Sequence, residues 1–73
     1  MELTIYQWRK VKDISQKKLA IIMGVHENTI RNWERHPEKL TIEKAEKIAD
    51  ALNVPIDSII FLSSIPQNVE LKK

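Results

Sequence analysis

The chain has 73 residues, a formal net charge of +2 and no cysteine. One domain fits this length, and compact helices are favoured over a large sheet because so small a core is only marginally stable. The absence of cysteine excludes a disulfide framework and a thiolate metal site or nucleophile, and no apolar run has the length that crossing a bilayer needs. We therefore expect a cytoplasmic domain without membrane contact, cofactor or bound metal.

Charged residues divide the chain into a basic and an acidic part. Up to Leu40, eight lysines and arginines accompany five acidic residues, whereas from Thr41 to Glu70 two lysines accompany five acidic residues. A DNA duplex attracts the first part and repels the second. A net charge of +2 does not by itself indicate nucleic-acid binding. If the protein binds DNA, however, this distribution predicts that the basic part faces the duplex.

A first helix is predicted from about Thr4 to Lys12. Thr4 is a favourable N-cap, and Ile5, Trp8 and Val11 recur on one helical face that we expect to be buried. Because Trp8 shares this face with Ile5, the alternative role of Trp8 as a base-stacking aromatic is disfavoured.

The stretch 15–35 predicts two short helices joined by a tight turn. Ser15 is a good N-cap for the helix over 16–23, and the following helix runs from about residue 26 to residue 35. Gly24, the only glycine of the chain, lies between them, where a sharp turn needs a positive φ that glycine adopts without steric cost. The residues that we expect to face the core are Leu19, Ala20, Ile22, Met23, Val25, Ile30 and Trp33.

Two further helices are predicted after residue 40. Thr41 caps a fourth helix over 41–52, and Asn53 suits the left-handed position that ends it. Pro55 opens a short fifth helix over 55–62, because proline is tolerated in a first turn. The expected core positions of these two helices are Ile42, Ala45, Ile48, Ala49, Leu52, Ile56, Ile59 and Ile60.

The end of the chain is expected to lie outside the core. One short amphipathic helix cannot hide all the apolar residues around position 60, so we expect Phe61 and Leu62 to form an exposed patch. We assign residues 1–62 to the domain and residues 63–73 to a tail. Apolar and polar residues alternate in this tail, which leaves a short strand pairing with a second subunit or disorder as the two interpretations.

A DNA-binding pattern runs through the central stretch. Ten positions match, without a gap, the helix-turn-helix pattern S/T-Q-x-x-L-A-x-x-x-G-V-x-x-x-T-I-x-x-W-E, namely Ser15, Gln16, Leu19, Ala20, Gly24, Val25, Thr29, Ile30, Trp33 and Glu34. From about Leu3 to Phe61 the chain resembles the lambda-repressor-like, Cro-type (XRE) family. The resemblance implies an all-α, compact five-helix domain in a bacterial or phage-infected cell. It also implies sequence-specific binding of double-stranded DNA, by a repressor or a phage Cro-like switch protein.

The resemblance places the outward side of the third helix in the major groove. Asn pairs with adenine, Arg with guanine, and Glu accepts from cytosine N4, so residue types of this kind are able to distinguish bases. An ordinary solvated helix face is the alternative interpretation. The expected base-reading residues are Glu27, Asn28, Arg31 and Asn32.

Residues around this helix are expected to bind phosphates. Solvated side chains are the alternative for the lysines, and helix capping is an alternative for His26. His36 stands where most family members have glycine, which leaves the conformation of the turn after the third helix open. The expected phosphate contacts are Gln16, Lys17, His26, Arg35 and Lys39.

The resemblance also implies a salt bridge between Arg9 and Glu34, which would join the first helix to the third. We interpret it as a structural ion pair that orients these helices, and not as a catalytic pair. His26 and His36 fall at opposite ends of one helix without a third ligand, so no metal site is expected.

Two functions remain open from the sequence, and an enzyme is not one of them. The chain has no phosphate loop, no nucleophile beside a base and no carboxylate cluster of a catalytic type. The first function is transcription regulation by a homodimer that forms at least on DNA. The alternative is an antirepressor or antitoxin-like regulator, which would sequester a protein partner such as a repressor through Phe61, Leu62 and the acidic fourth helix.

Overall fold

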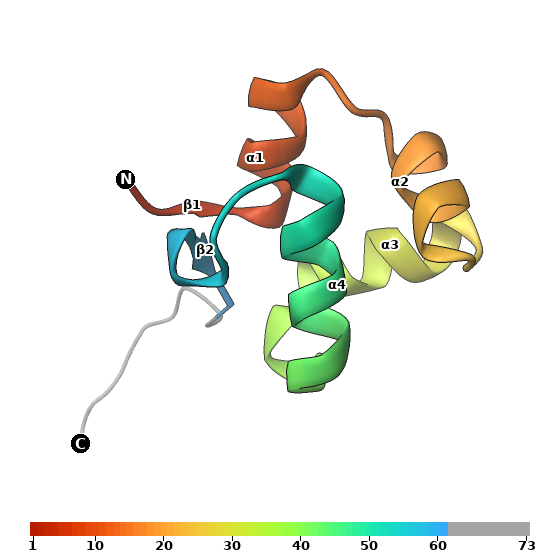
Figure 1. The fold of residues 1–73 in the computed structure, drawn as a ribbon. Coiled ribbons are helices and arrows are strands. Elements are labelled where there is room, and N and C mark those ends of the chain that lie inside the picture. Colours follow the sequence, from red (N-terminus) through yellow and green to blue (C-terminus); the bar gives the residue numbers. More distant parts are fainter. Residues whose placement is uncertain (62–73) are drawn as a thin grey trace.

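The structure, a computed structural model, describes residues 1–61 (Figure 1). Its elements in chain order are β1 (Leu3–Thr4), α1 (Ile5–Lys12), α2 (Gln16–Met23), α3 (Glu27–Arg35), the 3-10 turn η1 (Pro37–Lys39), α4 (Ile42–Leu52), the 3-10 turn η2 (Ile56–Ser58) and β2 (Ile59–Ile60). The described part is mostly helical, with four α-helices instead of the predicted five. None of its helices is long and apolar enough to cross a membrane. Leu62 and the predicted tail, residues 63–73, lie outside the described residues.

Three helices begin at the predicted caps. The side-chain oxygens of Thr4, Ser15 and Thr41 each accept a hydrogen bond from the backbone N–H three residues further on, at 3.0 to 3.2 Å. At Thr4 the bond is reciprocal, because Gln7 Oε1 accepts from the Thr4 backbone N–H at 2.9 Å. These bonds satisfy N–H groups that a helix start otherwise leaves without partners.

The residues that end the helices adopt two different backbone conformations. Asp13, Gly24 and Asn53 follow α1, α2 and α4 in the left-handed conformation, with φ values of 57°, 72° and 59°. The positive φ values of Gly24 and Asn53 confirm the sequence prediction. His36, by contrast, has φ −133° after α3, and the chain turns through η1 instead. The glycine that the family pattern expects at this position is therefore not required here.

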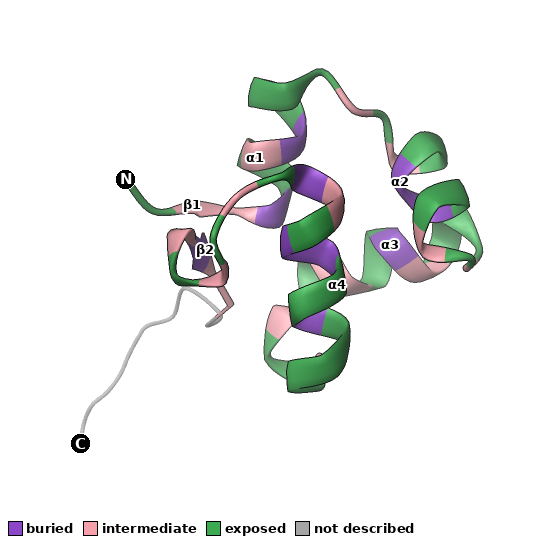
Figure 2. Cartoon of the chain, viewed as in Figure 1, coloured by how far each residue is buried: buried purple, intermediate pink, exposed green. Residues whose placement is uncertain are grey.

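Every α-helix contributes to one core. The buried residues lie on the inner sides of α1, α2, α3 and α4 and in β2 (Figure 2). The largest fully buried side chains are Ile5, Leu19, Ile30, Ile48 and Leu52. All five occupy predicted core positions, because spacing of three and four residues places apolar side chains on one helical face.

Three predicted core residues are exposed instead. Val11, Ile22 and Ile42 retain 62%, 51% and 77% of their accessible surface. Val11 lies in the last turn of α1, and Ile42 is the first residue of α4, so both are at helix ends. A helix of two to three turns buries only the part of its apolar stripe that meets a neighbour, which periodicity alone does not reveal.

The predicted fifth helix is wrong. After η2 the chain becomes extended, and β2 pairs in parallel with β1, Leu3 opposite Ile59 and Thr4 opposite Ile60. Ile59 and Ile60 are β-branched and suit an extended backbone, and β1 supplies the hydrogen-bonding partner. Phe61, which we expected in an exposed patch, is half-buried and packs against the core.

Candidate nucleic-acid interface

The turn between α2 and α3 fixes the direction of α3. Its backbone bonds run from the Gly24 N–H to the Ile21 carbonyl at 3.2 Å and from the Val25 N–H to the Ala20 carbonyl at 3.0 Å. Ala20 is buried, and its small side chain allows the two helices to approach closely. The two helices therefore form a helix-turn-helix unit in which α3 is anchored along one side.

The outward side of α3 is polar. Ile30 is its one buried residue, and Trp33 is half-buried beside it. The helical spacing places the predicted base-reading residues on the opposite face. The residues of this face, all exposed, are Glu27, Asn28, Arg31, Asn32 and Arg35.

Three of these outward side chains contact one another. Arg31 Nη1 donates to Asn28 Oδ1 at 2.6 Å, and Arg31 Nη2 lies 4.0 Å from Glu27 Oε2. From the sequence, each of the three residues was expected to read a base separately. Their spacing of three and four positions was the available signal, because side chains at these separations are neighbours on a helix.

A buried ion pair holds the inward side of α3. Arg9 Nε and Nη2 donate to the two carboxylate oxygens of Glu34 at 2.5 and 3.3 Å, and the side chains are only 6% and 8% exposed. Arg9 Nη1 also donates to the carbonyl of Ile14 at 3.0 Å. The Arg9–Glu34 bonds join α1 to α3 at the positions that the resemblance implied. The bond to Ile14 joins α1 to the segment before α2.

The predicted phosphate-binding residues come from α2, from the two ends of α3 and from η1. Gln16 is half-buried, and its amide Nε2 donates to Glu34 Oε1 at 3.0 Å, so it belongs to the ion-pair network. His26 occupies the N-cap of α3, but its side chain makes no capping hydrogen bond. The exposed members of the predicted set are Lys17, His26, Arg35 and Lys39.

A shallow hollow lies at the C-terminal end of α3. Its lining includes Asn32, Trp33, His36 and Lys39, so it brings a predicted base-reading residue beside a predicted phosphate contact. His36 Nδ1 lies 3.5 Å from a carboxylate oxygen of Glu38. Within residues 1–61, no group of three or more His, Cys, Asp or Glu side chains is arranged to hold a metal ion.

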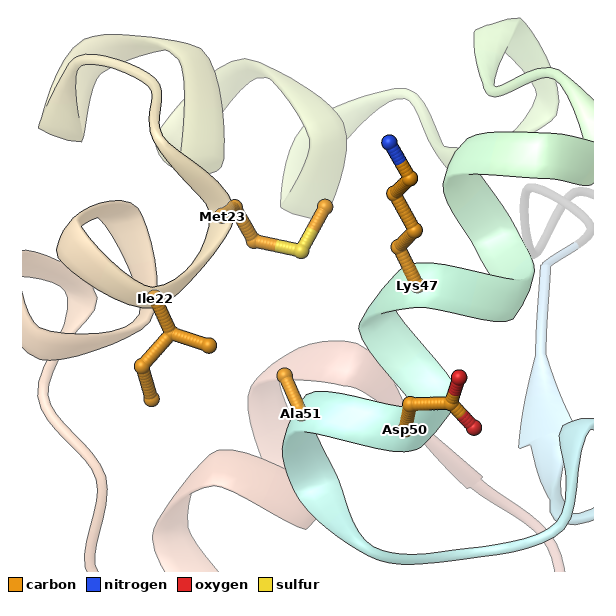
Figure 3. Close-up of a pocket in the computed structure, with 5 residues that line it drawn as sticks. All are labelled: Ile22, Met23, Lys47, Asp50 and Ala51. Carbon is orange, nitrogen blue, oxygen red and sulfur yellow. The ribbon is translucent and has the colours of Figure 1, made fainter.

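A second hollow, between α2 and α4, was not predicted. Ile22, Met23 and Ala51 supply its apolar part, and Lys47 and Asp50 supply its polar part (Figure 3). The uninterrupted apolar run from Leu19 to Met23 was the available signal, because such a run covers more than one helical face.

The family comparison covers most of the described chain. A family model described as "Helix-turn-helix" matches residues 5–59, which include all four α-helices. No curated protein and no solved structure matches the chain. The chain therefore belongs to the XRE family of lambda-repressor- and Cro-like helix-turn-helix domains, which bind DNA and regulate transcription.

Proposed function

We propose that the protein binds double-stranded DNA sequence-specifically, with α3 in the major groove. The observation that carries the proposal is the two-sided character of α3. Ile30 and the Arg9–Glu34 ion pair hold its inner side, and its outer side presents only exposed polar and charged residues. A major groove accepts a single helix, and base edges there offer distinct patterns of donors and acceptors. Glu27, Asn28, Arg31 and Asn32 are the proposed base-reading set.

Phosphate contacts would set the register of α3 on the duplex. Lys17 in α2, His26 and Arg35 at the two ends of α3, and Lys39 in η1 are all exposed, so their side chains are accessible to the backbone of DNA. Gln16 uses its amide nitrogen for Glu34, but this nitrogen carries two hydrogens, and the second is available to a phosphate. Such contacts position a protein without selecting a sequence, which leaves selection to α3.

The proposed regulatory role is that of a repressor or a Cro-like switch protein that acts as a homodimer on DNA. A helix-turn-helix dimer places its two recognition helices about one helical turn of DNA apart, roughly 34 Å. The uneven charge supports an orientation in which the part of the chain up to Leu40 faces DNA. The residues from Thr41 to Glu70 carry an acidic excess, which DNA repels.

The first experiment measures binding to a random-sequence duplex by fluorescence anisotropy at about 50 mM and about 200 mM salt. We expect a non-specific Kd of roughly 10⁻⁶ to 10⁻⁴ M that weakens steeply with salt, because bound phosphates release counterions. Each lost phosphate contact lowers the slope of log K against log salt by about one. The double variant Arg35→Ala/Lys39→Ala is therefore expected to reduce the slope by about two.

A matched control has the same charge change at two lysines whose observed neighbours lie outside α3. Lys12→Ala/Lys47→Ala removes one exposed lysine of α1 and one of α4 and is expected to keep the slope of the original protein. Absence of salt-sensitive binding would contradict the proposal, and so would equal slope changes in the two double variants. If binding occurs, selection from randomised duplexes then identifies the preferred site.

The α2–α4 hollow favours a second candidate function, binding of a regulatory protein partner. Ile21 and Ile22 are 71% and 51% exposed, and Ile22 lines the hollow (Figure 3). Exposed aliphatic side chains at the edge of a concavity are typical of protein contacts. The surface first assigned to this role consisted of Phe61, Leu62 and the acidic fourth helix. Phe61 is half-buried and therefore less suitable, and Leu62 lies outside the described residues.

The substitution Ile22→Asp separates the two candidates. With the selected site placed before a reporter gene, a variant that binds the site normally but loses regulation would favour the protein partner. Normal regulation by this variant, together with loss of regulation in Asn28→Ala/Asn32→Ala, would favour DNA binding as the working activity.

A further inference from the structure

The contacts among Glu27, Asn28 and Arg31 assign unequal roles to three residues of the outward face of α3. Arg31 donates to the Asn28 side-chain oxygen at 2.6 Å, and its other terminal nitrogen faces the Glu27 carboxylate at 4.0 Å. Both acceptors precede Arg31 by one helical turn, so they hold the guanidinium over the N-terminal half of α3. Arg31 and Glu27 nevertheless remain 45% and 47% exposed, so the cluster is accessible to DNA.

We propose that Arg31 is the guanine-reading residue of this protein and that Asn28 is a positioning residue that orients Arg31, instead of pairing with adenine itself. This inference rests on the proposed function and makes it more specific. It replaces the expectation that each residue reads a base independently.

The count of donors and acceptors supports this assignment. A guanidinium carries five N–H donors, and the Asn28 oxygen accepts one of them. Even with a second N–H directed at Glu27, enough donors remain for a bidentate contact to O6 and N7 of guanine. The cluster therefore still presents donors outward, and guanine offers two acceptors along its major-groove edge.

The same count disfavours adenine at Asn28. A bidentate Asn–adenine pair needs the side-chain oxygen to accept from the N6 amino group while the amide nitrogen donates to N7. In the structure this oxygen already accepts a charge-assisted bond from Arg31. The adenine amino group would have to share that oxygen beside a cation, which repels the positive end of an N–H donor.

Holding Arg31 in place also gives Asn28 a role that differs from ordinary surface pairing. Arginine is long and flexible, and ordering such a side chain on binding costs affinity. An acceptor that fixes the guanidinium beforehand reduces this cost for the base that matches the fixed orientation. The effect should therefore appear as base preference, whereas an ordinary exposed pair within a helix would change only stability, and only slightly.

The test uses the site selected from randomised duplexes and measures competition by anisotropy. The readout is the affinity for the selected site divided by the affinity for the same site with one guanine replaced by adenine. This guanine ratio is measured in turn at each guanine of the selected site. For Arg31→Lys we expect the guanine ratio to fall at one position, because lysine keeps the charge and lacks the planar fork. The expected fall is about 5-fold to 150-fold, the range of one bidentate contact.

Two substitutions at Asn28 then separate positioning from reading. Asn28→Ala removes the acceptor and should lower the guanine ratio several-fold. Asn28→Asp keeps an acceptor for Arg31 and should retain the guanine ratio, even though its added negative charge weakens binding to every duplex. Thermal melting by circular dichroism checks that each variant is folded.

Two different results would overturn the inference while the proposed function remained. One is a guanine ratio unaffected by Asn28→Ala, together with loss of preference for an adenine elsewhere in the site. The other is loss of the guanine ratio in Asn28→Asp to the same extent as in Asn28→Ala. If the unmodified protein shows no salt-sensitive binding and selects no site, the proposed function itself fails.

Discussion

The two sides of α3 carry similar ionic groups in opposite settings. On the inner side, Arg9 and Glu34 form a bidentate pair that is almost fully buried. On the outer side, Arg31 and Glu27 lie 4.0 Å apart with nearly half of each side chain exposed. A buried pair is costly to break because the remaining charge has neither water nor partner, whereas solvent screens an exposed pair. The comparison indicates that one side of α3 maintains the fold and the other remains free to bind.

The largest expected effect comes from breaking the inner side. Glu34→Ala leaves the Arg9 guanidinium buried without its carboxylate and also removes the acceptor of Gln16. We expect it to lower the free energy of unfolding by about 3 to 5 kcal/mol, measured by urea denaturation.

A double variant provides the control for this loss. In Arg9→Met/Glu34→Leu no charge remains buried, so we expect stability close to that of the original protein. A loss below about 1 kcal/mol in Glu34→Ala would be typical of an exposed pair, and it would contradict the role of the Arg9–Glu34 pair as a buried contact that maintains the fold.

A moderate effect is expected where a half-buried polar contact joins distant parts of the chain. Trp8 Nε1 donates to the carbonyl of Ser58 at 2.7 Å, between α1 and η2. Trp8→Phe removes the donor, and we expect a loss of about 1 to 2 kcal/mol in thermal or urea unfolding, since a carbonyl is left without its partner.

The loss of stability in Trp8→Phe should be concentrated near the Ser58 carbonyl. Hydrogen exchange in Trp8→Phe should increase most at Ile59 and Ile60, because η2 leads directly into β2. Exchange that increases equally at the turn around Gly24 would instead indicate a general loss of packing.

Substitutions on the outer side of α3 are expected to have the smallest effect on stability and a clear effect on DNA binding. Glu27→Gln neutralises an exposed carboxylate on the face that we propose lies against DNA. The free energy of unfolding should change by less than about 0.5 kcal/mol. Affinity for random duplex should rise a few-fold in the anisotropy assay, because one repulsion of phosphate is removed.

Glu46→Gln is the matched control for this variant. It makes the same charge change at an exposed position of α4, and it should leave affinity for random duplex close to that of the original protein. Equal gains in both variants would show that net charge alone governs binding, and they would contradict the assignment of α3 to the interface.

Local signals predicted much of the fold. Thr4, Ser15 and Thr41 act as the caps that their residue types favour, and Gly24 and Asn53 adopt positive φ. Caps and left-handed stops depend on interactions within a few residues, which the sequence displays directly. The ten matched positions of the helix-turn-helix pattern were equally accessible, and residues 5–59 match the family.

The features that the sequence did not predict depend on partners far away in the sequence or on which neighbouring element covers a side chain. Residues 55–62 have an apolar pattern compatible with a helix, but Ile59 and Ile60 pair with β1 near the other end of the described chain. Whether Ile22 and Ile42 are buried depends on which neighbour covers them, and none does so fully. For the outward face, composition indicated which residues are available, but not that Arg31 engages Asn28.

The boundaries of the four α-helices, the central turn and the residue types on the outward face of α3 were predictable from the sequence, because these follow from short-range spacing and capping. Tertiary structure alone decided the β1–β2 pairing, the turn at His36 without positive φ and the limits of the core. The physical reason is that burial and strand pairing require two segments to meet, and their combined geometry selects among conformations that each segment could adopt alone.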